Sequence, residues 1–102
     1  MMGCMLRARV TFLPTAQGGR YSPCTTGYRG QFHWKGEDEI SESSMQVIPE
    51  RWAQPGESTD ARFSFTENST SRLAGRIKVG DHFELREGRT VVAFGTVTEI
   101  EE

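Results

Sequence analysis

The sequence predicts an all-β protein, either an antiparallel sandwich or a barrel, and three observations support this. Short runs of alternating apolar and polar residues recur along the chain, as in strands that bury one face. Glycine and proline, 11 and 4 of the 102 residues, fall between these runs and mark turns. No segment of helical length carries apolar residues at a 3.6-residue period. At this length we expect one domain, residues 1–102.

The first strand is predicted over residues 6–12. Its apolar residues share one face and its polar residues the other, in the order Leu6, Arg7, Ala8, Arg9, Val10, Thr11 and Phe12. The two arginines give the strand a basic outer face, and exposed arginines of this kind are usually solvated and of small energetic weight. Leu13-Pro14 ends the strand.

A long loop with a following aromatic strand comes next, over residues 17–34. Gly18-Gly19 permits a sharp turn, from which Arg20 projects at once. Further along, Phe32 and Trp34 alternate with polar residues, which predicts a half-buried strand. A loop rich in glycine, threonine and arginine that leads into such a strand is typical of a recognition surface.

The middle of the chain is predicted to hold a loop, a short strand and a turn. Residues 35–44 are rich in acids and serines, which favours an exposed loop, and residues 45–48 form a short strand. Clustered carboxylates can bind a hard cation, but no EF-hand spacing is present, so we expect no metal site. Pro55-Gly56 suits the central positions of a type II turn.

The second half predicts two further strands and a hairpin. Ala61, Phe63 and Phe65 alternate with polar residues, a polar loop follows at 67–71, and a turn is predicted at 79–81. The glycosylation sequon in that polar loop should be silent because no secretory signal is present. Phe83 and Leu85 mark the next strand.

The last strand is predicted over residues 90–100, after a tight hairpin at Glu87-Gly88-Arg89. Val92 and Phe94 are in phase at its start, whereas Val97 is out of phase with them. This shift predicts a β-bulge next to Gly95.

Composition sets limits on the partners and the compartment. The net charge of −2 provides no global attraction for nucleic acid or membranes, so any RNA contact needs a local basic patch. The two cysteines, Cys4 and Cys24, do not form a disulfide framework, which favours a reducing compartment. No signal peptide and no apolar run of about 20 residues is present. We therefore expect a soluble, cytoplasmic protein without a membrane contact.

Three groups of residues resemble one domain family. Gly18, Gly19, Arg20 and Pro23 are followed by Gly27, Tyr28, Arg29, Gln31 and Phe32, then by Pro55-Gly56-Glu57 and by Leu85-Arg86-Glu87-Gly88-Arg89-Thr90-Val91. In order and spacing, from about residue 8 to residue 100, these are similar to the third, C-terminal domain of the elongation factor Tu family. The resemblance implies a closed antiparallel β-barrel of about six strands.

The resemblance also implies an RNA-binding site. In the family this domain touches the T-stem backbone of aminoacyl-tRNA, and the corresponding residues here are Arg20, Gln31, Glu87 and Gly88, with support from Gly18, Gly19, Arg29 and Arg89. An arginine forks onto phosphate, and an amide or carboxylate can bond a 2′-hydroxyl. Three positions depart from the family pattern: Tyr21 replaces a histidine, Gly30 replaces a proline, and the hairpin has one glycine fewer.

Structural roles remain open for the same residues. The glycines of both turns can be required by backbone geometry alone, and Tyr28 and Phe32 by the core. Arg20 can pair with an acid of residues 35–44, and Arg29 and Arg89 can form ordinary surface ion pairs.

The sequence predicts no enzyme, cofactor or nucleotide site. The phosphate-binding Gly-x-x-x-x-Gly-Lys-[Ser/Thr] loop and the Gly-x-Ser-x-Gly elbow are both absent from the 102 residues. Cys24 and His33 could form a nucleophile pair only with a group that lowers the thiol pKa, and His82 stands alone.

Two function classes therefore remain. The first is a binding module for tRNA-like folded RNA or for the translation machinery. The second is a protein–protein interaction module that competes for elongation-factor partners and does not bind RNA.

Overall fold

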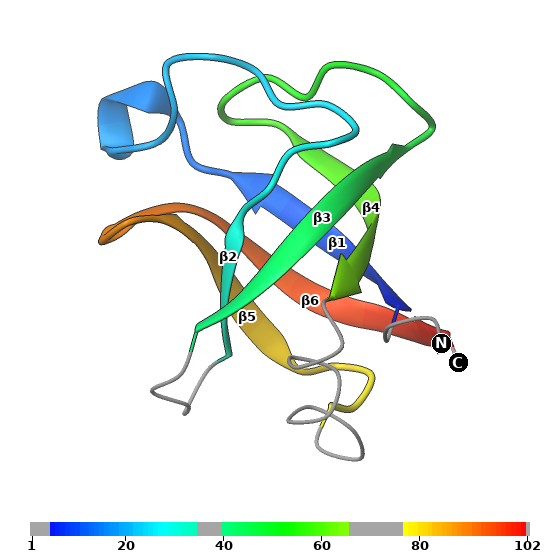
Figure 1. The fold of residues 1–102 in the computed structure, drawn as a ribbon. Helices are drawn as coiled ribbons and strands as arrows, with labels where there is room; N and C mark the ends of the chain where they lie inside the picture. The colour runs from blue at the N-terminus through cyan, green and yellow to red at the C-terminus, as the bar shows by residue number, and fades with distance from the viewer. Residues whose placement is uncertain (1–4, 35–39, 66–76, 102) are drawn as a thin grey trace.

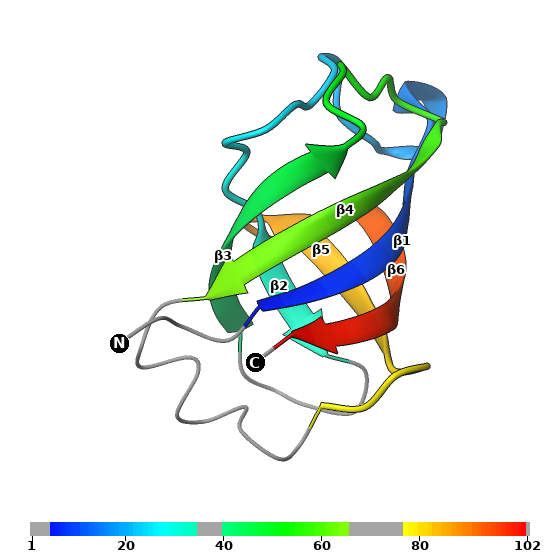
Figure 2. The same ribbon diagram turned by 90° about the vertical axis from the view of Figure 1, so that its right-hand side faces the viewer.

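Six antiparallel strands wind into a closed barrel in a computed structural model that describes residues 5–34, 40–65 and 77–101 (Figures 1 and 2). The strands are β1 Met5–Phe12, β2 Gln31–Trp34, β3 Ile40–Ile48, β4 Ser58–Phe65, β5 His82–Glu87 and β6 Thr90–Glu101. Their order around the barrel is β1-β4-β3-β2-β5-β6, and β1 pairs with β6 to close it. The prediction of a closed antiparallel barrel of about six strands is confirmed.

The inward residues of the strands fill the barrel with aromatic rings. Phe32, Phe63 and Phe83 are fully buried, one each from β2, β4 and β5. The rings of Phe32 and Phe83 stack with centroids 4.1 Å apart, and Phe63 meets Phe32 edge-on at 4.7 Å. Such pairs add about 0.5–1.5 kcal/mol to the roughly 2–3 kcal/mol from burying each ring. The predicted inward face of β2, with Phe32 and Trp34, is also confirmed.

The prediction of an exposed loop over residues 35–44 was wrong for residues 40–44. Strand β3 begins at Ile40, and Ser41 and Ser43 are buried on its inward face. The Ser43 hydroxyl donates to the carbonyl oxygen of Gly30 at 3.0 Å. Small side chains fit beside the crowded aromatic rings, and this hydrogen bond satisfies a polar group that the composition alone placed in solvent.

The predicted bulge next to Gly95 was also wrong. The register of β6 shifts opposite Leu85/Arg86 and again opposite Arg7/Ala8, on either side of Gly95. Ala93, Gly95 and Val97 all face inward, whereas Phe94 faces outward. Gly95 leaves room for the Phe83 ring, since a Cβ there would lie 2.7 Å from Phe83 Cε1. The glycine therefore serves core packing instead of a bulge.

The long loop between β1 and β2 is held at one end of the barrel (Figure 1). It contains a short 3₁₀ turn, η1, over Thr15–Gln17, and an isolated bridge between Cys24 and Ala53. The predicted turns at Pro55-Gly56, Val79-Gly80 and Gly88-Arg89 are present. The sequon and polar loop predicted over residues 67–71 and the residue Cys4 lie outside the described residues. Among those described, no helix has the length and hydropathy needed to cross a bilayer.

Candidate nucleic-acid interface

Arg20, Tyr28 and Glu87 form a compact polar cluster where the long loop meets the end of β5. The Arg20 guanidinium pairs with Glu87 Oε2, and the Tyr28 hydroxyl donates to the same oxygen at 2.6 Å. Arg20 Cζ lies 5.0 Å from the centre of the Tyr28 ring, a cation–π distance. Arg20 Nε also donates to the carbonyl of Ser22 at 3.2 Å. Among the described residues the ion-pair partner of Arg20 is Glu87, and the acids at positions 37–39, which the sequence also offered as partners, lie outside the described residues.

The cluster shifts the proton affinities of its members. Burial, reinforced by the hydrogen bond to Glu87, raises the pKa of Tyr28 well above its ordinary value. For Arg20, partial burial opposes the charge, but the hydrogen bond to Glu87 and the surrounding negative groups outweigh it, so its pKa is raised. Around neutral pH the cluster therefore holds a permanent cation and a neutral phenol. The side chain of Arg20 remains about a quarter exposed.

The cluster forms one side of an open groove of about 680 Å³, which we call the Arg20 groove. Strands β2, β3 and β5 supply much of the rest, because Gln31 pairs with Glu42 on one side and Arg86 on the other. The charged residues that line it are Arg20, Arg29, Glu42, Arg86 and Glu87, and its lining also includes Gln31 and Gly88. Three arginines and two glutamates line the groove; of these arginines, Arg20 is paired with Glu87 and Arg86 with Glu84.

Gln31 and Gly88 also line this groove. Gln31 is half-buried, and its Oε1 atom is itself buried, with no hydrogen-bond partner among the described residues. Gly88 has a φ of +63° in the two-residue hairpin, a backbone conformation that favours glycine. The hairpin thereby brings its main chain to the groove without a side chain in the way.

The supporting residues predicted from the sequence separate into two groups. Arg29 lines the Arg20 groove, whereas Gly18, Gly19 and Arg89 do not. Gly19 is buried, and a Cβ there would meet the Leu13 and Pro14 main chain, 2.9 Å from the Pro14 carbonyl oxygen. Its position therefore serves the turn.

Two groove residues, Glu42 and Arg86, were not among the candidates predicted from the sequence. Both stand directly across from Gln31 in the sheet. The acids and serines of residues 35–44 predict a loop instead of the strand that carries Glu42, and the hairpin residues that the family resemblance implies for RNA contact begin after Arg86. A correct strand register for β3 and β5 would have identified both.

Cys24 and His33 are poorly placed to act as a nucleophile pair. Cys24 is buried against Ala53, and burial raises the pKa of its thiol to about 11, which disfavours the nucleophilic thiolate. His33 lies instead beside Glu84, with Nδ1 3.5 Å from Oε1. Within the described ranges, no three His, Cys, Asp or Glu side chains converge as metal ligands would.

Comparison with known proteins identifies relatives of this barrel. Residues 4–101 match the family model described as the elongation factor Tu C-terminal domain. The chain is 35% identical over 97 residues to Elongation factor Tu 2 of Streptomyces avermitilis. That alignment covers 93% of this chain but only 22% of the relative, so the chain spans about a fifth of the length of that protein.

Proposed function

The chain belongs to the elongation factor Tu C-terminal domain family, and on this premise we propose that it is a non-catalytic module that binds the backbone of folded, tRNA-like RNA in the Arg20 groove. One observation supports this most directly. The fold brings Arg20, Gln31, Glu87 and Gly88, the four residues carried over from the family motifs, to one groove. The strand register and the hairpin place them there from three distant parts of the chain.

The chemistry of the groove suits an A-form backbone. Double-stranded RNA is bound mainly through phosphates and 2′-hydroxyls along its shallow groove. Arg20 and Arg29 supply cations for phosphate, and the side chain of Gln31 lines the same groove. Glu87 shares its Oε2 with Arg20 and Tyr28, which leaves Oε1 to accept from a 2′-hydroxyl. The backbone of Gly88 can approach a ribose closely.

The proposal is tested by measuring the affinity of the purified chain for folded tRNA across a salt series. Log affinity should fall as log salt rises, because neutralised phosphates release their counterions. Arg20→Ala should weaken binding about 10-fold or more and reduce the salt slope by about 1, as expected for one phosphate contact. Lys78→Ala is the matched control, because it also removes one positive charge. Lys78 lies before the start of β5, whereas Glu87 of the Arg20 groove lies at the other end of that strand. If the chain does not bind tRNA at low salt, the proposal is wrong.

A protein-interaction module is the second candidate function, and two exposed aromatic residues favour it. Tyr21 is 92% exposed and Trp52 is 60% exposed, and both flank the Cys24–Ala53 bridge in sequence. Aromatic side chains of this kind often anchor protein interfaces. Capture of a translation factor that persists after ribonuclease treatment, and is lost in a Tyr21→Ser, Trp52→Ser double variant, would favour this function over RNA binding.

A further inference from the structure

The outer face of β1, β6 and β5 carries an exposed aromatic residue, Phe94, whose placement the core does not explain. Phe94 is 47% exposed, whereas Ala93 and Gly95 on either side of it face inward and are buried. An aromatic side chain on the outward face of a strand contributes little to folding, because its ring stays partly in water.

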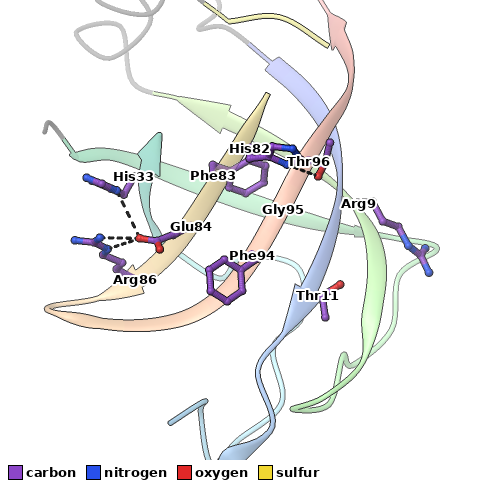
Figure 3. A pocket seen from close by; sticks show the side chains of 10 residues that line it. All are labelled: Arg9, Thr11, His33, His82, Phe83, Glu84, Arg86, Phe94, Gly95 and Thr96. Carbon is purple, nitrogen blue, oxygen red and sulfur yellow. Dashed lines mark hydrogen bonds and ion pairs between the residues drawn. The ribbon is translucent and has the colours of Figure 1, made fainter. Parts of the chain in front are cut away.

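The strand register surrounds Phe94 with polar side chains in two rows across the sheet. Thr11, Phe94, Glu84 and His33 are successive cross-strand neighbours in one row, and Arg9, Thr96 and His82 in the next. These residues line an open hollow of about 580 Å³, the Phe94 hollow, a volume suited to a small planar group (Figure 3). Figure 3 shows Phe94 between Thr11 on β1 and the His33, Glu84 and Arg86 cluster.

The charges around the hollow favour an anionic ligand. Its one acid, Glu84, is already compensated, since Arg86 donates two hydrogen bonds to Glu84 Oε1 at 2.6 and 3.0 Å and His33 lies against the same oxygen. Arg9 turns toward Asp60, but both side chains are more than half exposed, so this pair is weak and can be exchanged for another anion. His82 and Thr96 share a hydrogen bond at 2.9 Å and add polar edges.

These features resemble a stacking platform for nucleic acid more than a peptide groove. A base can stack on an exposed aromatic ring on a sheet face while an arginine holds its phosphate. An extended peptide commonly binds by adding a strand to a free sheet edge, and a closed barrel has no such edge here. Arg86 also lines the Arg20 groove, so the two surfaces are continuous.

We propose that the Phe94 hollow holds an unpaired nucleotide of the same RNA whose paired backbone lies in the Arg20 groove. In this arrangement the base stacks on Phe94 and contacts the hydroxyls of Thr11 and Thr96. The phosphate of the nucleotide replaces Asp60 as the ion-pair partner of Arg9. The proposal rests on the proposed RNA-binding function and specifies the ligand, a stem with an adjoining unpaired nucleotide.

The test compares two RNAs of the same stem, one fully paired and one with a three-nucleotide bulge, at one salt concentration. The wild-type chain should bind the bulged RNA more tightly. Phe94→Ala should weaken binding to the bulged RNA by about 5- to 100-fold, the range for loss of an aromatic stacking platform, and leave the paired RNA unaffected. Phe94→Tyr should retain the preference, and Phe94→Leu, which keeps apolar volume without a ring, should lose it.

A second readout is independent of affinity. 5-Iodouridine placed in the bulge should crosslink to Phe94 on irradiation, and thermal unfolding of each variant checks that the barrel is intact. Equal binding of both RNAs by the wild type, or a preference that Phe94→Leu retains, would overturn this inference and leave the Arg20 groove proposal standing. If Phe94→Ala weakens binding of the bulged RNA and Arg20→Ala has no effect, the proposal for the Phe94 hollow is supported and the proposal for the Arg20 groove is wrong. Phe94-dependent binding of an acidic peptide with no bulge preference would assign the hollow to a protein instead.

Discussion

Arg20 and Glu87 are 67 residues apart in the chain and form an ion pair at the Arg20 groove, where the Tyr28 hydroxyl donates to the same carboxylate oxygen. The cation proposed to bind phosphate is thus neutralised by the chain itself in the free protein. An RNA phosphate must compete with Glu87 for the guanidinium, and this competition lowers the affinity that Arg20 could otherwise provide.

Replacing this carboxylate should strengthen RNA binding. Glu87→Gln removes the negative charge and keeps an oxygen that can accept from a 2′-hydroxyl. We expect tRNA affinity to rise about 3- to 10-fold at low salt and the gain to shrink at high salt, because the effect is electrostatic. Filter binding or fluorescence anisotropy measures it. Glu57→Gln makes the same charge change beside Arg51 and should have little effect. Weaker binding by Glu87→Gln would show that RNA requires the carboxylate charge.

The Gly18-Gly19 turn should be required for stability more than for RNA affinity. Gly19→Ala places a methyl group against the Leu13 and Pro14 main chain, which cannot move aside as a flexible side chain would. We expect a loss of about 2–3 kcal/mol in the free energy of unfolding, as for overpacked sites. Gly18 has open space but a φ of +93°, so Gly18→Ala should cost only about 1 kcal/mol. Urea denaturation compares the two, and an equal loss would contradict the steric explanation.

The sequence predicted the elements whose alternation is strongest. Strand β1, with four apolar residues in strict alternation, and β5, with Phe83 and Leu85, lie where they were expected. Strand β3 was predicted only in part, because the buried Ser41 and Ser43 carry no apolar signal, and the hydrogen bond that satisfies the Ser43 hydroxyl is made to Gly30 in another part of the chain. Serine is usually exposed in folded proteins, whereas both of these serines are buried.

The residues that line the Arg20 groove were predictable only in part, and their arrangement was not predictable. The motif positions of Arg20, Gln31 and Glu87 predicted that these residues serve one surface, and the barrel places all three along one groove. Sequence could not show that Arg20 and Glu87 neutralise each other, because the pair depends on where the long loop folds back over β5. The Phe94 hollow was not predicted, because the spacing of Val92 and Phe94 indicates a shared inward face, whereas the register shift opposite Leu85/Arg86 turns Phe94 outward.

Replacing Gly95 by a residue with a side chain should destabilise the core, because the Phe83 ring occupies the space that a Cβ would need. Gly95→Ala directs a methyl group into the buried Phe83 ring, which is packed between Phe32 and Phe63 and cannot swing aside. We expect a loss of about 2–3 kcal/mol in unfolding free energy. Phe83→Leu in the Gly95→Ala background should recover part of this loss, although it is destabilising alone. A double-mutant cycle by urea denaturation measures the coupling, and simple additivity would exclude a direct clash.

Burial of Cys24 should make the barrel less stable in alkaline solution. Its pKa rises from an ordinary value of 9.0 to about 11 in the folded chain, so between these values the unfolded thiol loses its proton while the folded thiol keeps it. The unfolded state then binds fewer protons, and the free energy of unfolding falls as pH rises, by roughly 2 kcal/mol across this window. The raised pKa of Tyr28 acts in the same direction at still higher pH.

Urea denaturation between pH 7 and 10.5 under reducing conditions measures this dependence. Below pH 8 the stabilising contribution is fully present, so the stability of the wild type should be constant there with respect to this thiol. Cys24→Ala removes the titrating group and should decline less steeply above pH 9. Tyr28→Phe, which removes the other group whose raised pKa acts in this direction, serves as the matched control and should keep the steep loss between pH 9 and 10. If wild type and Cys24→Ala decline in parallel, the thiol titrates alike in the folded and unfolded chain.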